Sequence, residues 1–88
     1  MLEELSLETI YPNPARSITV IPVSSGMAVE ATIEIVDVSG KTIQTVFEGK
    51  LPIGKSNYYI HANQFTPGTY FVTLKTVDRN FVQKLVIK

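Results

Sequence analysis

The sequence predicts an all-β domain, an immunoglobulin-like antiparallel β-sandwich of about seven strands. Apolar and polar residues alternate through most of the 88 residues, and Gly, Pro, Ser or Asn interrupt the alternation at short intervals. No window has a convincing helical period. Short strands with turns about every eight to twelve residues are typical of a sandwich. Because the chain has no cysteine, apolar burial has to stabilise it without a disulfide.

Length, charge and hydropathy limit the class of protein. We expect one domain over residues 1–88, in which residues 1–8 form a strand or are a linker or an added segment. Eight basic residues balance eight acidic ones, which argues against nucleic acid or an anionic membrane as the main partner. No apolar run reaches the roughly 18 residues that span a bilayer. The acidic start is no secretory signal peptide, so for an exported protein we expect a fragment with a start methionine added.

The alternation places the strands in order along the chain. Leu5 and Leu7 alternate with polar neighbours in the first strand, and Ile18 and Val20 share one face of the second. The expected strands cover residues 5–7, 16–23, 30–38, 41–47, 58–62, 69–77 and 81–88.

The third strand changes phase near its end. Ile33 and Ile35 share one face, whereas Val36 and Val38 lie on the other. Either both faces are covered, or a bulge near Val36 resets the phase; we favour the bulge. Ser39–Gly40 then predicts a tight hairpin into the fourth strand.

The second half of the chain contains a longer connection and two turns. Residues 48–57, with two glycines and one proline, are typical of a polar connection. Residues 66–69 predict a type II turn, because Pro67 presets φ at the second position and Gly68 supplies a positive φ at the third. Tyr70 follows where sandwiches often place a tyrosine whose hydroxyl bonds back across the corner. Asp78–Asn80 turns the chain into the last strand.

No residue pattern points to catalysis, and we expect no catalytic residue, metal or cofactor. His61 is the only histidine, and the residues that follow it offer no ligands at metal-site spacing, so we expect a half-exposed strand residue. No serine lies in a Gly-x-Ser-x-Gly elbow, so a Ser-His-Asp triad has no support. No glycine-rich loop precedes a helix that could hold a phosphate.

The carboxylates and aromatic side chains have structural explanations. Asp37 is expected to stabilise its hairpin and Asp78 to shape its turn through neighbouring backbone. Glu30 and Glu34 share a strand face, and a glycosidase pair would need a groove around it. Five aromatic residues could form a sugar-binding platform, but alternation sends some to the core, and we favour core packing. These are Tyr58, Tyr59, Phe65, Tyr70 and Phe71.

The segment after the first strand contains two prolines, two positions apart. Residues two apart in an extended segment direct their N–H groups to the same side, so Pro12 and Pro14 leave one side without donors. Tyr11 and Asn13 keep theirs and are held extended because each precedes a proline. We expect a segment that pairs along one edge only and protects the edge of the sandwich.

Four stretches in a fixed order, "YPNPA", "VDVSGKTI", "FTPGTYFVTL" and "VQKLVIK", resemble the C-terminal sorting domain of the type IX (Por) secretion system, type A. The resemblance covers roughly residues 9–88. The matching residues are Tyr11, Pro12, Asn13 and Pro14 (opening motif), Asp37, Gly40 and Lys41 (central turn), Pro67, Gly68 and Tyr70 (corner), and Lys84, Leu85, Val86, Ile87 and Lys88 (closing segment). The turn before the last strand often contains glycine in the family; here Asn80 is expected to tolerate a left-handed conformation.

The resemblance implies a non-catalytic immunoglobulin-like domain at the end of a larger cargo protein. Such domains direct the cargo from the periplasm across the outer membrane of certain Gram-negative bacteria to the cell surface. A sortase-like peptidase then usually removes the domain and often joins the cargo to an anionic lipopolysaccharide. The processing site precedes the opening motif, within Met1–Thr9 or upstream, and is assigned to no residue.

The machinery has to recognise a surface common to many cargoes. We expect it to pair with main-chain groups at the edge of the terminal strand, while Leu85 and Ile87 can also complete the core. Isolated domains are expected to associate weakly, if at all, through exposed edges.

The alternative function is that of a fibronectin-like accessory or adhesion module that binds carbohydrate or protein. The position of the domain in the full gene distinguishes the two: a sorting domain must be followed by a stop codon after Lys88, whereas an adhesion module need not be. A free-standing inhibitor or enzyme has no supporting motif.

Overall fold

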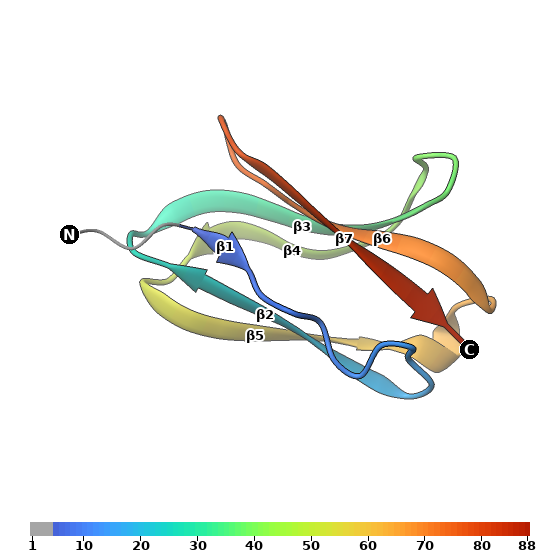
Figure 1. The fold of residues 1–88 in the computed structure, drawn as a ribbon. Helices are drawn as coiled ribbons and strands as arrows, with labels where there is room; N and C mark the ends of the chain where they lie inside the picture. Colours follow the sequence, from blue (N-terminus) through green and yellow to red (C-terminus); the bar gives the residue numbers. More distant parts are fainter. Residues whose placement is uncertain (1–4) are drawn as a thin grey trace.

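The computed structural model describes residues 5–88 and contains seven strands and one short 3-10 helix (Figure 1). The elements are β1 (Ser6–Leu7), β2 (Ile18–Ser25), β3 (Val29–Asp37), β4 (Thr42–Leu51), β5 (Gly54–His61), η1 (Ala62–Gln64), β6 (Gly68–Lys75) and β7 (Asn80–Ile87). The strands form two antiparallel sheets in the orders β1-β2-β5 and β4-β3-β6-β7. The predicted β-sandwich is therefore confirmed. In the described part of the chain, no helix has the length and apolar character to cross a membrane.

The core lies between the two sheets, and in β3 it follows the alternation that the sequence predicts. In β2, Ile18 and Val20 share the outer face, and the inward phase is the other one. Ile21 and Val23 of β2 and Ile33 and Ile35 of β3 are at most 1% exposed. Each fully buried aliphatic side chain of this kind contributes about 1.5–3 kcal/mol through removal of apolar surface from water. The first strand also belongs to this core, because Leu5 is buried and β1 pairs with β2. The four residues before Leu5 lie outside the described part of the chain.

The predicted polar connection over residues 48–57 is wrong. β4 continues to Leu51 and β5 begins at Gly54, so only Pro52 and Ile53 connect these two strands. Leu51, which is fully buried, anchors the end of β4. Both strands lie at the edges of their sheets, where polar residues face solvent, and their sequence therefore resembles a loop.

The expected irregularity near Val36 exists, but the extra residues lie in the partner strand. The register between β3 and β4 shifts between Ile33 and Glu34 and again between Ile35 and Val36. At these points β4 contributes one additional residue, first Val46 and then Ile43. In β3 inward and outward side chains alternate without interruption up to Val36. Val36 therefore lies on the outer face as a regular member of the strand, and no bulge in β3 is needed to explain it.

The turn before β7 is organised by Thr76. Its N–H donates to the C=O of Arg79 at 2.9 Å, and its hydroxyl oxygen accepts from the N–H of Arg79 at 3.0 Å. Asp78 accepts a hydrogen bond from the Thr76 hydroxyl at 3.3 Å instead of bonding neighbouring backbone. Among residues 5–88 no residue other than glycine has a positive φ, so the left-handed conformation expected for Asn80 does not occur. The two hydrogen bonds between Thr76 and Arg79, three positions apart, close the turn without a left-handed residue.

Candidate functional site

The central turn is closed by the carboxylate of Asp37. Its Oδ1 accepts hydrogen bonds from the N–H and hydroxyl of Ser39 at 2.9 and 2.7 Å and from the N–H of Lys41 at 3.0 Å. Gly40 adopts a φ of 89°, which favours glycine, and donates its N–H to the C=O of Asp37 at 3.0 Å. The Ser39 hydroxyl, followed by the Lys41 N–H, lowers the pKa of Asp37 below 3.8. The expected role of Asp37 in the hairpin is confirmed.

The corner before β6 is closed by Tyr70. Its hydroxyl donates to the C=O of Thr66 at 2.5 Å, as predicted for a tyrosine at this position. Its ring contacts Phe65 edge to face, with 5.4 Å between ring centroids. Gly68 has the predicted positive φ, but the value of 154° is far from the roughly 80° of a type II turn. The tyrosine hydrogen bond, more than an ideal turn, holds this corner.

The opening motif lies against the terminal strand, more than 70 residues further along the chain. The side-chain amide of Asn13 donates to the C=O of Lys84 at 2.9 Å, and its side-chain oxygen accepts from the N–H of Val86 at 3.0 Å. The N–H of Ala15 donates to the C=O of Val86 at 2.8 Å. The N–H of Lys88 in turn donates to the C=O of Ala15 at 2.9 Å. The opening motif and the closing segment are therefore one structural unit.

The opening motif also contacts the other sheet. The main chains of Tyr11 and Val20 exchange hydrogen bonds of 3.2 and 2.7 Å, and the Thr19 hydroxyl donates to the C=O of Pro12 at 3.3 Å. Residues 12–14 bend, and both X–Pro peptide bonds are cis. The expectation of an extended segment that pairs along one edge only is wrong. Its protection of a sheet edge is confirmed, because Asn13 and Ala15 bond to the main-chain edge of β7. The segment crosses between the sheets, and the Asn13 side chain supplies hydrogen-bonding groups toward β7.

Gln83 forms a second connection, which the sequence analysis missed. Its side-chain oxygen accepts from the N–H of Ile10 at 2.8 Å, and its side-chain nitrogen donates to the C=O of Glu8 at 2.8 Å. Gln83 occupies the same phase of β7 as Leu85 and Ile87, which are buried. A polar residue in the inward phase of a strand was the available signal, because such a residue needs a hydrogen-bonding partner.

The four motifs are contiguous at one end of the sandwich (Figure 1). Asp37, Tyr70 and Leu85 are cross-strand neighbours on β3, β6 and β7. Ala15 pairs with Ile87 in a parallel bridge. β1 lies toward the opposite end of a domain that is 40 Å long. We call the end that carries the motifs the motif pole, defined by residues 11–16, 37–41, 66–70 and 84–88.

Comparison with known proteins shows the family to which the chain belongs. The family model described as the secretion system C-terminal sorting domain matches residues 9–88. The chain belongs to this family. The sorting domain is thus a signal for type IX secretion, which serves a larger cargo protein and leads toward the cell surface or the extracellular space. No curated protein matches the chain.

The closing segment of the sorting domain divides into inward and outward side chains. Leu85 and Ile87 are buried in the core, whereas Lys84 and Lys88 are exposed and Val86 is half-buried. The expectation that the machinery pairs with the main-chain edge of this segment does not fit the fold. The C=O of Lys84, both main-chain groups of Val86 and the N–H of Lys88 already have partners in the opening motif.

The aromatic platform considered from the sequence does not assemble. Phe65 and Tyr70 are buried, and the ring of Tyr58 packs against Phe47 with 4.9 Å between centroids. Of the five predicted members only Tyr59, at 58%, is largely exposed. Core packing, the favoured interpretation, is confirmed for most of them. His61 is an exposed residue of β5, and residues 5–88 contain no group of three or more candidate ligands that could hold a metal.

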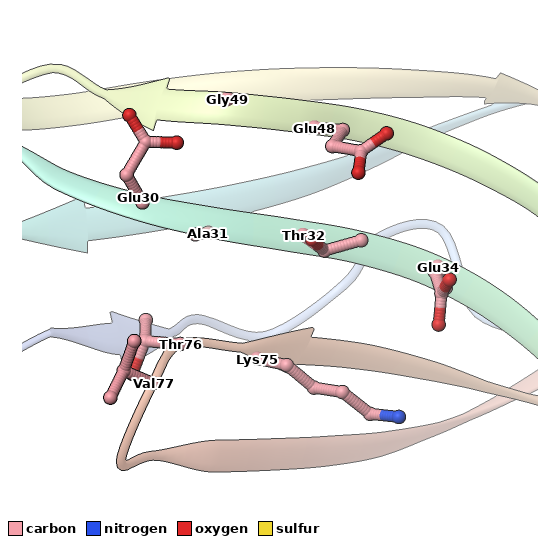
Figure 2. Close-up of a pocket in the computed structure, with 9 residues that line it drawn as sticks. All are labelled: Glu30, Ala31, Thr32, Glu34, Glu48, Gly49, Lys75, Thr76 and Val77. Atoms are coloured by element: carbon pink, nitrogen blue, oxygen red, sulfur yellow. The ribbon is translucent and has the colours of Figure 1, made fainter.

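Glu30 and Glu34 line an open hollow on the outer face of the four-stranded sheet (Figure 2). Thr32 lies between them on β3, and Glu48 of β4 lies across from it. Glu30 and Glu34 are four positions apart on β3, a distance of about 13 Å along the strand. Glycosidase carboxylate pairs are closer, at roughly 5–9.5 Å. These glutamates form the solvated face that the sequence predicts.

Proposed function

We propose that this sorting domain carries an N-terminal cargo from the periplasm across the outer membrane, and that the type IX machinery recognises side chains of the motif pole. The observation that carries the proposal is that four motifs far apart in sequence meet at one end of the sandwich. Cargo would join at the opposite end, beyond β1, and leave the motif pole accessible. In this function the domain needs no catalytic residue of its own.

The test is a fusion of residues 1–88 to the C-terminus of a fluorescent protein that is exported to the periplasm of a type IX-competent host. Surface fluorescence is expected only with the domain attached. The matched control is the same fluorescent protein without it. Equal surface delivery of both proteins would refute the proposal.

Removal of the domain at the surface is the second part of the proposal. A sortase-like peptidase would cut upstream of the opening motif, because residues from Ser6 onward are bonded into the sandwich. Mass spectrometry of the surface-bound cargo should find its last residue before Tyr11. A cargo that keeps residues 11–88 at the surface would show that cleavage is not part of the function.

Weak self-association is also possible in physical terms, because β4 and β5 end their sheets and present main-chain edges. The register shifts in β4 disturb one of these edges, so we propose only weak pairing. Sedimentation equilibrium over a wide concentration range tests it. A monomer at the highest soluble concentration would remove this part of the proposal.

A second candidate function is a carbohydrate-binding accessory module. Tyr11 and Tyr59 flank Val20 on the outer face of the three-stranded sheet and are 54% and 58% exposed. Asn57 lines a hollow beside Tyr11. Glycan-array binding that is lost in Tyr59→Ala, together with failed surface delivery, would favour this function over sorting.

A further inference from the structure

The charged side chains of the domain are unevenly distributed. The motif pole contains four basic residues and one acidic residue. Its net side-chain charge is therefore +3, although the whole chain is neutral. The basic residues are Arg16, Lys41, Lys84 and Lys88. The acidic one, Asp37, already accepts three hydrogen bonds within its turn. Glutamates instead line the outer face of β3 and β4 toward the other end.

Three of these basic side chains share one surface. Lys84 and Lys88 occupy the outward phase of β7, because the alternate residues Leu85 and Ile87 are buried. Ala15 pairs in parallel with Ile87, which places exposed Arg16 beside Lys88. The cations therefore follow the outer side of the terminal strand.

An apolar strip lies next to these cations. Lys84 is directly opposite Phe71, and Phe71 is directly opposite Val36, so the three side chains point to the same side of the sheet. Val82 and Val86 continue the strip along β7, and Val82 is 57% exposed. We define the basic face as Val36, Phe71, Val82, Lys84, Val86 and Lys88.

We propose that the basic face docks onto an acidic surface of a protein of the secretion apparatus, one that carries a small apolar spot; this inference rests on the proposed function. Charge complementarity selects such a partner, since a positive strip with an apolar centre attracts and orients an acidic surface. The main-chain edge beside it is occupied by the opening motif, so recognition uses side chains.

Other occupants of the basic face fit less well. A symmetric contact with a second copy would bring Lys84 and Lys88 near their own copies and bury like charges. A membrane would gain little, because Val36, Phe71 and Val86 are half-buried within the sheet and offer little apolar surface to lipid. An acidic protein surface with a small apolar spot is complementary to the basic face in both charge and shape.

The experiment uses the fluorescent fusion with two double charge reversals. K84E/K88E changes the basic face, whereas the control K50E/K55E makes the same charge change at exposed positions of β4 and β5 outside the motif pole. Neither pair changes the residues in the core. Thermal unfolding of the purified domains is measured first, so that both variants are known to be folded.

The expected result is a loss of surface fluorescence of about tenfold or more for K84E/K88E, with periplasmic accumulation of uncleaved fusion, and little change for K50E/K55E. Equal delivery by both variants, or equal loss in both, would overturn the inference while the wild-type fusion still reports on the sorting function. Failure of the wild-type fusion would instead overturn the proposed function.

A vesicle assay separates the protein partner from a membrane. The purified domain is sedimented with vesicles of phosphatidylcholine and phosphatidylglycerol in equal parts, at low and at physiological salt. No binding at physiological salt is expected. Binding at physiological salt that K84E/K88E abolishes would assign the basic face to lipid and overturn the proposed protein partner.

Discussion

The side chain of Asn13 takes the place of a neighbouring strand for Val86. Its oxygen accepts the N–H of Val86 at 3.0 Å, while its nitrogen donates to the C=O of Lys84 at 2.9 Å. One amide group thus pairs with the exposed edge of β7 as a main-chain peptide would. This contact joins the first and last motifs of the sorting domain.

Replacement of Asn13 by Ala should weaken the edge of β7. Two hydrogen bonds are lost in a solvent-accessible place, so the free energy of unfolding should fall by about 1–2 kcal/mol. Urea denaturation measures this change, and hydrogen exchange of the Val86 amide should become faster. The control is Asn63→Ala at an exposed position of η1. An unchanged exchange rate at Val86 would contradict the assigned contact.

Replacement of Gln83 by Ala should lower the free energy of unfolding more than replacement of an exposed glutamine does. The N–H of Ile10, a residue only 1% exposed, would lose its partner, and an unsatisfied buried donor costs about 1–3 kcal/mol. Gln64→Ala in η1 is the matched control, because its side chain is exposed. Chemical denaturation of both variants tests the prediction, which similar losses of stability in the two would refute.

Tyr70→Phe should destabilise the corner without a change in the core. The ring keeps its contact with Phe65, whereas the hydrogen bond to Thr66 disappears, at a cost of about 0.5–1.5 kcal/mol. Thermal unfolding should show a lower midpoint. Tyr59→Phe, which removes a hydroxyl from an exposed ring, is expected to melt as the wild type does; a midpoint equally lowered by both changes would argue against a special role of Tyr70.

Leu85→Ala should show that the closing segment is part of the core. Truncation of a fully buried leucine costs about 2–5 kcal/mol, a large share of the roughly 4–13 kcal/mol expected for a domain of this size. Val86→Ala, at a half-buried outward position, should cost much less. Equal unfolding midpoints would contradict this difference. Deletions of residues 84–88 therefore remove stability as well as a recognition surface, and export assays should use outward substitutions.

Acid should loosen the central turn by protonating Asp37. Because the folded-state pKa lies below 3.8, ionised Asp37 stabilises the fold above that pH, and this stabilisation is lost as the pH falls through the folded-state value. The amide resonances of Ser39 and Lys41 should shift together in an NMR titration. Asp37→Asn has no carboxylate to protonate, so the same resonances should not move with this transition. A midpoint above 3.8 would contradict the prediction.

Local chemistry made several parts of the fold predictable from the sequence. The period of two predicted the buried face of β3. In β2 the pair named from the sequence, Ile18 and Val20, lies on the outer face instead. Asp37 and Tyr70 were predicted with their structural roles. Both bond to backbone within four residues of themselves, so the residues that make each contact are close in sequence.

The tertiary structure decided how distant segments meet. Asn13 reaches Lys84 and Val86, and Gln83 reaches Ile10, across more than 70 residues. An amide side chain matches any free main-chain pair, so residue type alone does not identify its partner. The lengths of β4 and β5 were also missed, because edge strands expose one side and carry polar residues as loops do. The sequence by itself therefore determined the order of the strands along the chain, the inward face of β3 and the turns closed by Asp37 and Tyr70. The packing of the two sheets brought the four separate motifs to the motif pole. The physical reason is that burial of the whole core, to which residues from every part of the chain contribute, decides which strands lie side by side.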